Sequence, residues 1–174
     1  MQTLSKIHGS GDPVYMNSIK DGFNMFANYN DKLDHRYANY NYAELATDHR
    51  EVYFKISQGL QLYKNSGLSA MGVIHGDPVF SNIFLCDRAT LKFIDMRGKV
   101  GQELTIYGDI FYDYAKIYQS LMGYDFVVAG YEINETYLSS VRSHFVYWFK
   151  LNFSEPHWHY LKFLTASLFF SLIP

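Results

Sequence analysis

Residues 71–98 constrain the fold of this chain more than any other part of its sequence. Two apolar segments, 83–86 and 91–94, flank the polar residues 87–90. Two apolar runs around a short polar turn are typical of a β-hairpin. A polar motif precedes the first strand and another follows the second. The sequence therefore predicts that a hairpin brings two polar motifs to one edge.

The first polar motif lies at residues 75–82, which read HGDPVFSN. An aspartate such as Asp77 can accept the proton of an attacking hydroxyl in a phosphoryl-transfer site. Five residues later, Asn82 can place its amide oxygen on a metal ion. Gly76 and Pro78 suit the tight turn that would aim both groups at one cleft.

The second polar motif lies at residues 93–98, which read FIDMRG. Asp95 comes directly after a predicted strand, and its carboxylate is a good ligand for Mg²⁺. A four-residue turn would pair Cys86 with Leu91, and the same register sets Asn82 opposite Asp95. Opposed residues of antiparallel strands have Cα atoms about 4.5–5.5 Å apart. With Asp77 nearby, this register predicts a divalent-metal and phosphate site, which a slip of one residue would break.

The third motif lies at residues 107–116, which read YGDIFYDYAK. Apolar periodicity predicts a helix over 109–122, with Asp109 as its N-cap. Asp113 lies four residues further, on the same helical face, and its apolar neighbours indicate that it reaches a buried donor. Lys116 is interpreted as a solvated helix residue.

The remaining segments read as mostly helical. Periodicity predicts helices over 44–65, 134–153 and 157–172, together with a short helix that contains Leu4 and Ile7. Residues 17–42 are expected to form short helices joined by loops. The chain contains 16 Tyr and 14 Phe, which we interpret as an aromatic helical core.

Composition excludes several classes of function. The net charge is −2 and no basic stripe is present, so nucleic-acid binding has little electrostatic support. Cys86 is the only cysteine, which predicts a reducing, cytoplasmic location. The apolar run at 163–174 spans 12 residues, too few for a membrane span, and is expected to be a buried helix. His157 and His159 have no third ligand nearby, so packing is favoured over metal binding.

Together the motifs H-G-D-x-x-x-x-N, I-D-x-R-G and G-D-x-x-x-D-x-A-K resemble those of the aminoglycoside phosphotransferase and choline-kinase-like superfamily. These proteins share the protein-kinase fold. The wording of the motifs is most similar to that of bacterial members associated with capsule or surface-polysaccharide genes. Residues 4–8, LSKIH, also resemble the helix that begins the C-terminal lobe of the family. The resemblance implies a mostly helical α+β fold, with residues 1–174 forming a C-terminal catalytic lobe that carries a small β-hairpin.

The resemblance also implies a reaction. The γ-phosphoryl group of ATP would move to a hydroxyl of a small molecule: a sugar-like compound, an amino alcohol or an aminoglycoside. Asp77 would be the catalytic base, and Asn82 with Asp95 would hold Mg²⁺ against the ATP phosphates.

Three further residues have supporting roles by the same resemblance. His75 would be a structural residue of the catalytic loop, and Asp113 would accept hydrogen bonds from the backbone of that loop. Arg97 would contact a phosphate or brace the loop.

The sequence departs from the family at its start. The family has an N-terminal lobe with a phosphate-covering loop and a lysine that pairs with ATP phosphates. Residues 9–11 read GSG, which is not G-x-G-x-x-G, and no lysine-bearing strand precedes the catalytic motif. We therefore expect a missing N-terminal lobe. The alternative is a non-catalytic kinase-like binding or scaffolding module, but a scaffold has no need of Asp77, Asn82 and Asp95 together.

Overall fold

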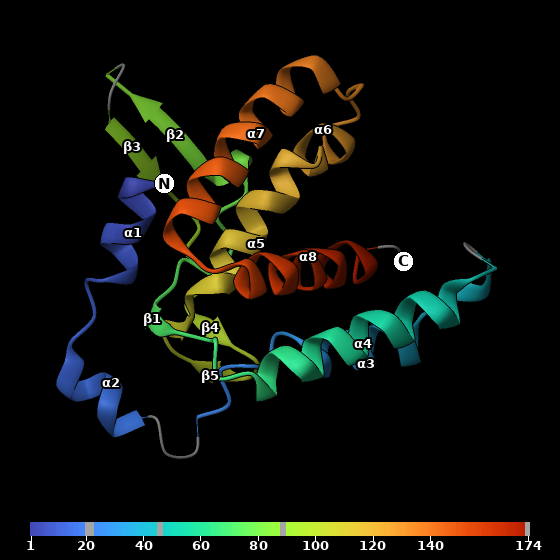
Figure 1. Cartoon of the computed structure of the whole chain (residues 1–174), viewed down its shortest axis with the longest axis horizontal. Coiled ribbons are helices and arrows are strands. Elements are labelled where there is room, and N and C mark those ends of the chain that lie inside the picture. Colours follow the sequence, from blue (N-terminus) through green and yellow to red (C-terminus); the bar gives the residue numbers. More distant parts are fainter. Residues whose placement is uncertain (20–22, 45–46, 88–89, 173–174) are drawn as a thin grey trace.

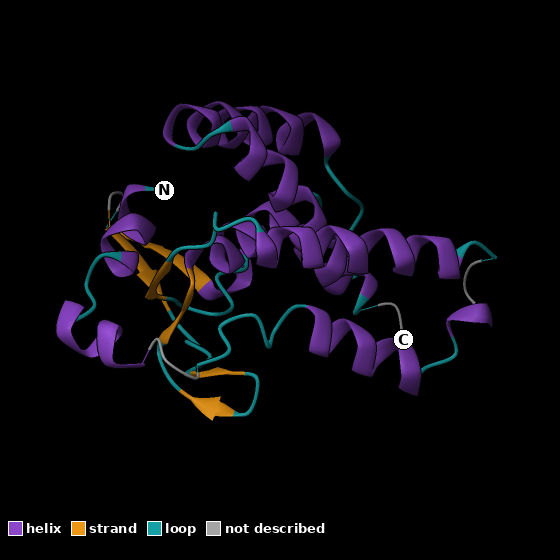
Figure 2. Ribbon diagram, turned by 60° about the horizontal axis from the view of Figure 1, so that its bottom comes forward, coloured by secondary structure: helices purple, strands orange, loops and turns teal. Residues whose placement is uncertain are grey.

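The computed structural model describes residues 1–19, 23–44, 47–87 and 90–172 of the chain. Over these residues the chain forms eight α-helices and three small two-stranded antiparallel sheets (Figures 1 and 2). The predicted class, a mostly helical α+β fold, is confirmed. Within the described part of the chain, no helix is both long and apolar enough to cross a membrane.

The helices follow the predicted periodicity closely. They are α1 Gln2–His8, α2 Pro13–Ile19, α3 Asn30–Asn39, α4 His49–Asn65, α5 Ile110–Leu121, α6 Tyr124–Val128, α7 Glu135–Asn152 and α8 Glu155–Phe170. Prediction and structure agree within two residues at both ends of α5, α7 and α8. Helix α4 starts five residues later than predicted, and residues 45–46 of that prediction lie outside the described residues. Helix α6 was not predicted.

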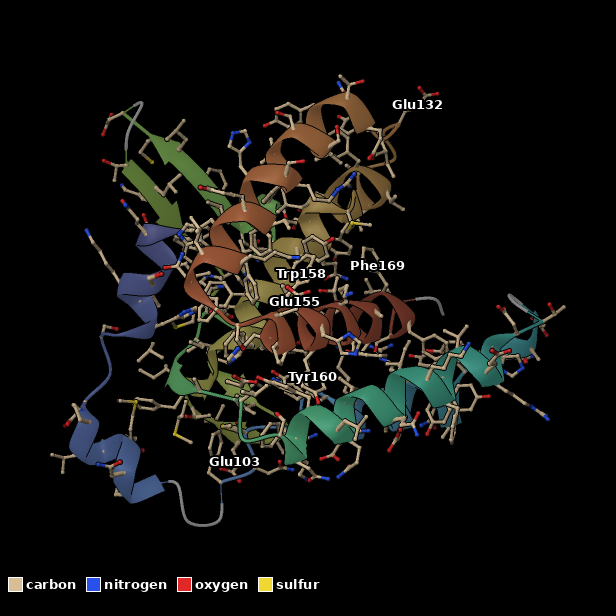
Figure 3. The ribbon with its side chains drawn as sticks, in the orientation of Figure 1. Glu103, Glu132, Glu155, Trp158, Tyr160 and Phe169 are labelled. Atoms are coloured by element: carbon tan, nitrogen blue, oxygen red, sulfur yellow. The ribbon has the colours of Figure 1, made fainter. Side chains whose placement is uncertain are left out.

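Helix α8 is the centre of the fold, because it packs between α5 and α4 (Figure 1). Its inward face buries Leu161, Leu164 and Leu168. Gly59 of α4 allows the close approach on one side, since a Cβ atom there would lie 2.3 Å from the ring of Phe163. Figure 3 shows Tyr160 between α8 and α4, where its ring lies 5.4 Å from that of Tyr63.

Aromatic side chains fill much of this core, as the composition predicted. Tyr37 stacks on Tyr53 with ring centroids 4.0 Å apart, and Tyr42 stacks on Phe170 at 4.4 Å. Buried tyrosine hydroxyls need partners, and Tyr42 donates a 2.9 Å hydrogen bond to the carbonyl of Phe170. The aromatic residues therefore pack helices together rather than form an open stacking surface.

The sheets are small and lie around the polar motifs. Strand β1 (Met71–Val73) pairs with β6 (Tyr107–Asp109), and β4 (Lys99–Val100) pairs with β5 (Glu103–Leu104). Strand β2 (Ile83–Cys86) pairs with β3 (Thr90–Phe93) and forms the predicted hairpin. The pairing of β1 with β6 joins the segment before the first motif to the segment that opens α5.

The hairpin register differs by one residue from the predicted register. Cys86 pairs with Thr90, not with Leu91, because three residues rather than four separate the paired strand ends. Asp87 begins this turn with φ +50°, in the left-handed region. As a result, Asn82 lies beside Ile94, whose amide donates a 3.0 Å hydrogen bond to the carbonyl of Asn82. The predicted direct opposition of Asn82 and Asp95 is wrong.

Candidate active site

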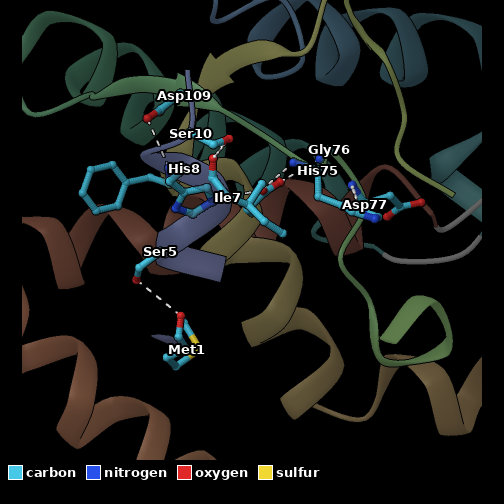
Figure 4. A network of polar contacts seen from close by, with 11 residues as sticks. Met1, Ser5, Ile7, His8, Ser10, His75, Gly76, Asp77 and Asp109 are labelled. Carbon is cyan, nitrogen blue, oxygen red and sulfur yellow. Dashed lines mark hydrogen bonds and ion pairs between the residues drawn. The ribbon is translucent and has the colours of Figure 1, made fainter. Parts of the chain in front are cut away.

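The polar loop, residues 75–82, is fixed by a single buried carboxylate. Asp113 of α5 is fully buried and accepts hydrogen bonds from the amides of His75 (2.7 Å) and Gly76 (2.8 Å). The Nε2 atom of His8 lies 3.1 Å from the same carboxylate. Figure 4 shows His8 of α1 beside His75 and Gly76. The backbone contact that the resemblance implied for Asp113 is therefore present.

Asp109 supports the start of α5 rather than the loop itself. Its side chain accepts a hydrogen bond from the amide of Phe111, as predicted for an N-cap. The hydroxyls of Tyr63 and Tyr29 also donate to it, at 2.6 and 2.8 Å. Burial raises the pKa of Asp109, while these hydrogen bonds act in the opposite direction. Asp109 is thus a structural acceptor within the aromatic core.

His75 is also a buried, structural member of the loop. Only 2% of its surface is exposed, and its ring lies 5.6 Å from that of Phe93. Its Nδ1 atom accepts a 3.3 Å hydrogen bond from the amide of Asp77. These contacts shape the turn that presents Asp77.

Asp77 forms an ion pair that the sequence did not predict. Lys116 of α5 lies with Nζ 3.0 Å from Oδ1 of Asp77, and its side chain is only 8% exposed. The interpretation of Lys116 as a solvated residue is therefore wrong. Oδ1 is buried, whereas the Asp77 side chain as a whole is 38% exposed, so the exposed surface belongs to its other atoms, including Oδ2. Lys116 thus holds one oxygen of the Asp77 carboxylate, and the other side of the carboxylate is accessible to solvent.

Asn82 closes the polar loop. Its Nδ2 atom donates a 2.9 Å hydrogen bond to the backbone carbonyl of Asp77. Because this bond uses the amide nitrogen, it fixes which end of the side chain is the oxygen. The oxygen is left as an acceptor for a ligand or a cation.

Asp95 lies alongside the polar loop in spite of the register error. Backbone amides on both sides of Asp95 donate hydrogen bonds to carbonyls of the loop. The amide of Ile94 donates to Asn82, and the amide of Arg97 donates to His75 (2.9 Å). Asp95 itself has φ +57°, so the alternation of faces along β3 does not continue through it. A non-glycine residue in this conformation is uncommon and often marks a functional site.

The donor chemistry of Asn82 and Asp95 fits Mg²⁺. They offer one amide oxygen and one carboxylate, and Mg²⁺ is usually held by one or two carboxylates together with substrate phosphates and water. Within the described ranges, no group of three or more His, Cys, Asp or Glu side chains could hold a metal ion. Phosphate oxygens would therefore have to complete the coordination.

Arg97 braces the polar loop from outside. Its backbone amide donates the hydrogen bond to His75 described above. Its Nη1 atom donates a 3.1 Å hydrogen bond to the hydroxyl of Tyr112. Its aliphatic part lies over Gly76, where an added Cβ atom would be 2.7 Å from Cβ of Arg97. Gly76 has φ +83°, so glycine is required there both for backbone conformation and for space.

Replacing Gly76 by alanine should therefore cost more stability than the left-handed backbone strain alone would cost. Gly67 is a matched control, because it has φ +70° but no atom within 4 Å of an added Cβ. We expect Gly67→Ala to cost about 1–2 kcal/mol. Gly76→Ala should cost roughly 1–3 kcal/mol more, through overpacking against Arg97. Urea unfolding of both variants measures the difference, and equal losses would show that the contact with Arg97 is unimportant.

Two hollows lie near this site without containing its polar groups. One, of about 530 Å³, is lined by residues that include Met16, Phe26 and Met71. The other, of about 560 Å³, is mainly apolar and is lined by residues that include Phe80 and Ile117. Neither is lined by Asp77, Asn82 or Asp95, so the site is identified by its chemistry rather than by the shape of a cavity.

Comparisons with family models, with curated proteins and with solved structures found no match. The description of this site therefore rests on the chain itself. Among the groups gathered around Asp77, Lys116 was missed although a signal existed. It lies three residues after Asp113 and seven after Asp109, which places all three on one face of α5. The contact of His8 with Asp113 spans 105 residues and has no local signal.

Proposed function

We propose that this chain is the catalytic part of a small-molecule kinase, which transfers the γ-phosphoryl group of ATP to a hydroxyl. The observation that carries this proposal is the state of Asp77. One of its carboxylate oxygens is held by Lys116, the remainder is accessible, and Asn82 and Asp95 lie on the adjoining backbone. A fixed carboxylate beside two potential cation ligands is the arrangement that hydroxyl phosphorylation needs.

In the proposed reaction, Asp77 orients the acceptor hydroxyl and accepts its proton. The hydroxyl oxygen forms a bond to the γ-phosphorus, the bond from that phosphorus to the bridging oxygen breaks, and ADP leaves. Mg²⁺, when bound, would neutralise charge on the phosphate oxygens. Asn82 and Asp95 would hold this ion, and Lys116 would keep the Asp77 carboxylate in place. Catalysis of this kind depends on positioning and charge rather than on a covalent intermediate.

Phosphorus NMR tests this function directly. The chain is incubated with Mg²⁺-ATP and a panel of hydroxyl compounds: neutral and acidic sugars, amino alcohols and aminoglycosides. We expect ADP and one phosphate ester to appear together in equal amounts. Conversion of ATP to inorganic phosphate alone, or no conversion with any acceptor, would count against the proposal.

A sugar-like hydroxyl compound is our first choice of acceptor. This choice follows only from the similarity of the motifs to those of phosphotransferases associated with capsule and surface polysaccharides. Amino alcohols and aminoglycosides, the acceptors that name the wider superfamily, come next.

A binding or scaffolding role is the second candidate, and exposed apolar side chains on the hairpin favour it. Phe84 is 50% exposed and Leu85 is 66% exposed. Such a surface is available for another protein or for a further part of the same protein. If scaffolding is the role, replacing Phe84 and Leu85 by serine should abolish partner binding, while Asp77→Asn should leave it unchanged.

A further inference from the structure

Two cationic side chains, Lys116 and Arg97, lie beside the segment that contains Asp77, and the charges of a third, Lys32, and of these groups act on one another. Lys116, from α5, forms the ion pair described above. Arg97, after β3, lies against Gly76, the residue that precedes Asp77. The third is Lys32, from the first turn of α3.

The start of α3 places Lys32 in this group. Tyr29 is the N-cap of α3, and its ring centroid lies 5.7 Å from that of Tyr112, the residue whose hydroxyl binds Arg97. Lys32 is half-buried one turn further along the chain. Among the described residues, no carboxylate lies within 4.0 Å of its ammonium group.

The charges that act on Lys32 are mostly positive. Burial is the main cause that lowers its pKa, to about 8, and the positive charges of Lys116, Arg97 and Arg36 act in the same direction. Asp77 supplies the opposing negative charge. Like charges held close together are unfavourable unless an anion joins them.

We propose that Lys32, Arg97 and Lys116 form an anion-binding site beside Asp77, which takes a phosphate or carboxylate group of the ligand. Lys116 pairs with Asp77, while Lys32 and Arg97 form no ion pair among the described residues, so an anion would balance the local charge. Guanidinium and ammonium groups together bind phosphate and carboxylate oxygens well. The position beside Asp77 would set the anionic group close to the hydroxyl that reacts.

Two sources can supply this anion. One is the terminal phosphate of the nucleotide, and the other is an acidic group on the acceptor, such as the carboxylate of a uronic acid or the phosphate of a sugar phosphate. Anion binding by these side chains goes beyond the proposed function, because it does not require transfer to occur. Failure of the kinase proposal would therefore leave this inference open to its own test.

Sulfate is the probe for this test, because it keeps its charge of −2 between pH 6 and 9. Isothermal titration of sulfate into the wild-type chain at pH 7 should give one site. Lys32→Gln should weaken this binding about tenfold, the usual loss when one charged hydrogen bond is removed. Lys32→Arg should retain it. Lys162→Gln, an exposed lysine on α8, is the matched control and should change nothing.

Two further readouts sharpen the test. Wild-type affinity for sulfate should fall as pH rises through about 8, because Lys32 loses its proton, and this fall should be absent in Lys32→Gln. Displacement of sulfate by Mg²⁺-ATP would assign the anion site to the nucleotide phosphate, whereas persistence would assign it to an acidic acceptor. No sulfate binding by the wild type, or equal binding by a folded Lys32→Gln variant, would overturn the proposal.

Discussion

Asp77→Asn is expected to lose phosphoryl transfer by roughly 10³-fold or more while the chain stays folded. Asparagine has nearly the same shape, but it cannot accept the proton of an acceptor hydroxyl. The exposed side of Asp77 is the part that would face this hydroxyl, so the loss should appear in kcat. Coupled measurement of ADP release, with circular dichroism as a check on folding, gives both results.

Because Asp77 pairs with Lys116, a second substitution can separate a loss of stability from a loss of activity. Asp77→Asn leaves the buried ammonium group of Lys116 without its counter-charge, which should cost some stability. Adding Lys116→Met to Asp77→Asn should restore stability but not activity. Asp87→Asn, at an exposed left-handed position in the hairpin turn, is the matched control and should keep full activity. Near-native turnover by Asp77→Asn would remove Asp77 from the catalytic role.

Asp113→Ala should destabilise the protein by about 3–5 kcal/mol, the usual cost of removing one partner from a buried charged network. The amides of His75 and Gly76 lose their acceptor, and His8 loses the carboxylate that lies 3.1 Å from its ring. Each donor is buried, so water cannot replace the carboxylate without a rearrangement. Urea unfolding measures the loss.

The control for Asp113 is an exposed aspartate. Asp34 lies on the outer face of α3 and accepts one hydrogen bond, from the hydroxyl of Tyr53. Asp34→Ala should cost about 1 kcal/mol or less. Hydrogen exchange should also show that the amides of His75 and Gly76 lose protection in Asp113→Ala. A loss of stability no larger than that of Asp34→Ala would mean that Asp113 does not fix the polar loop.

The helices were predictable because their signals are local. The apolar spacing of α5 and α7 sets one face of each helix, and Asp109 supplies the N-cap of α5 from its own side chain. The hairpin was predictable for the same reason, since its two strands lie only a few residues apart. Its register was not, because a turn of three residues and a turn of four fit the same sequence pattern. In the structure Cys86 pairs with Thr90, and Asp87 after it has a left-handed conformation.

The remaining features depend on contacts between distant parts of the chain. Strands β1 and β6 are each three residues long, too short for a recognisable pattern, and they pair across 33 or more residues. Lys116 reads as a surface lysine until the polar loop is placed over α5. Lys32 lies in no motif, and the start of α3 that carries it is placed by the contact of Tyr29 with Tyr112, which no local pattern predicts. The sequence thus predicts the carboxylates, the asparagine and Arg97, but not Lys116 or Lys32.

Titration of Mg²⁺-ATP into the chain and into Asp95→Asn tests the central claim most directly. The account predicts binding by the wild type that depends on Mg²⁺, and a loss of about tenfold or more in Asp95→Asn, because one carboxylate ligand of the ion is gone. Asp87→Asn serves again as the control and should bind like the wild type. Equal binding of Mg²⁺-ATP by the wild type and Asp95→Asn, or no binding by the wild type at millimolar nucleotide, would contradict the assignment of a phosphoryl-transfer site to this part of the protein.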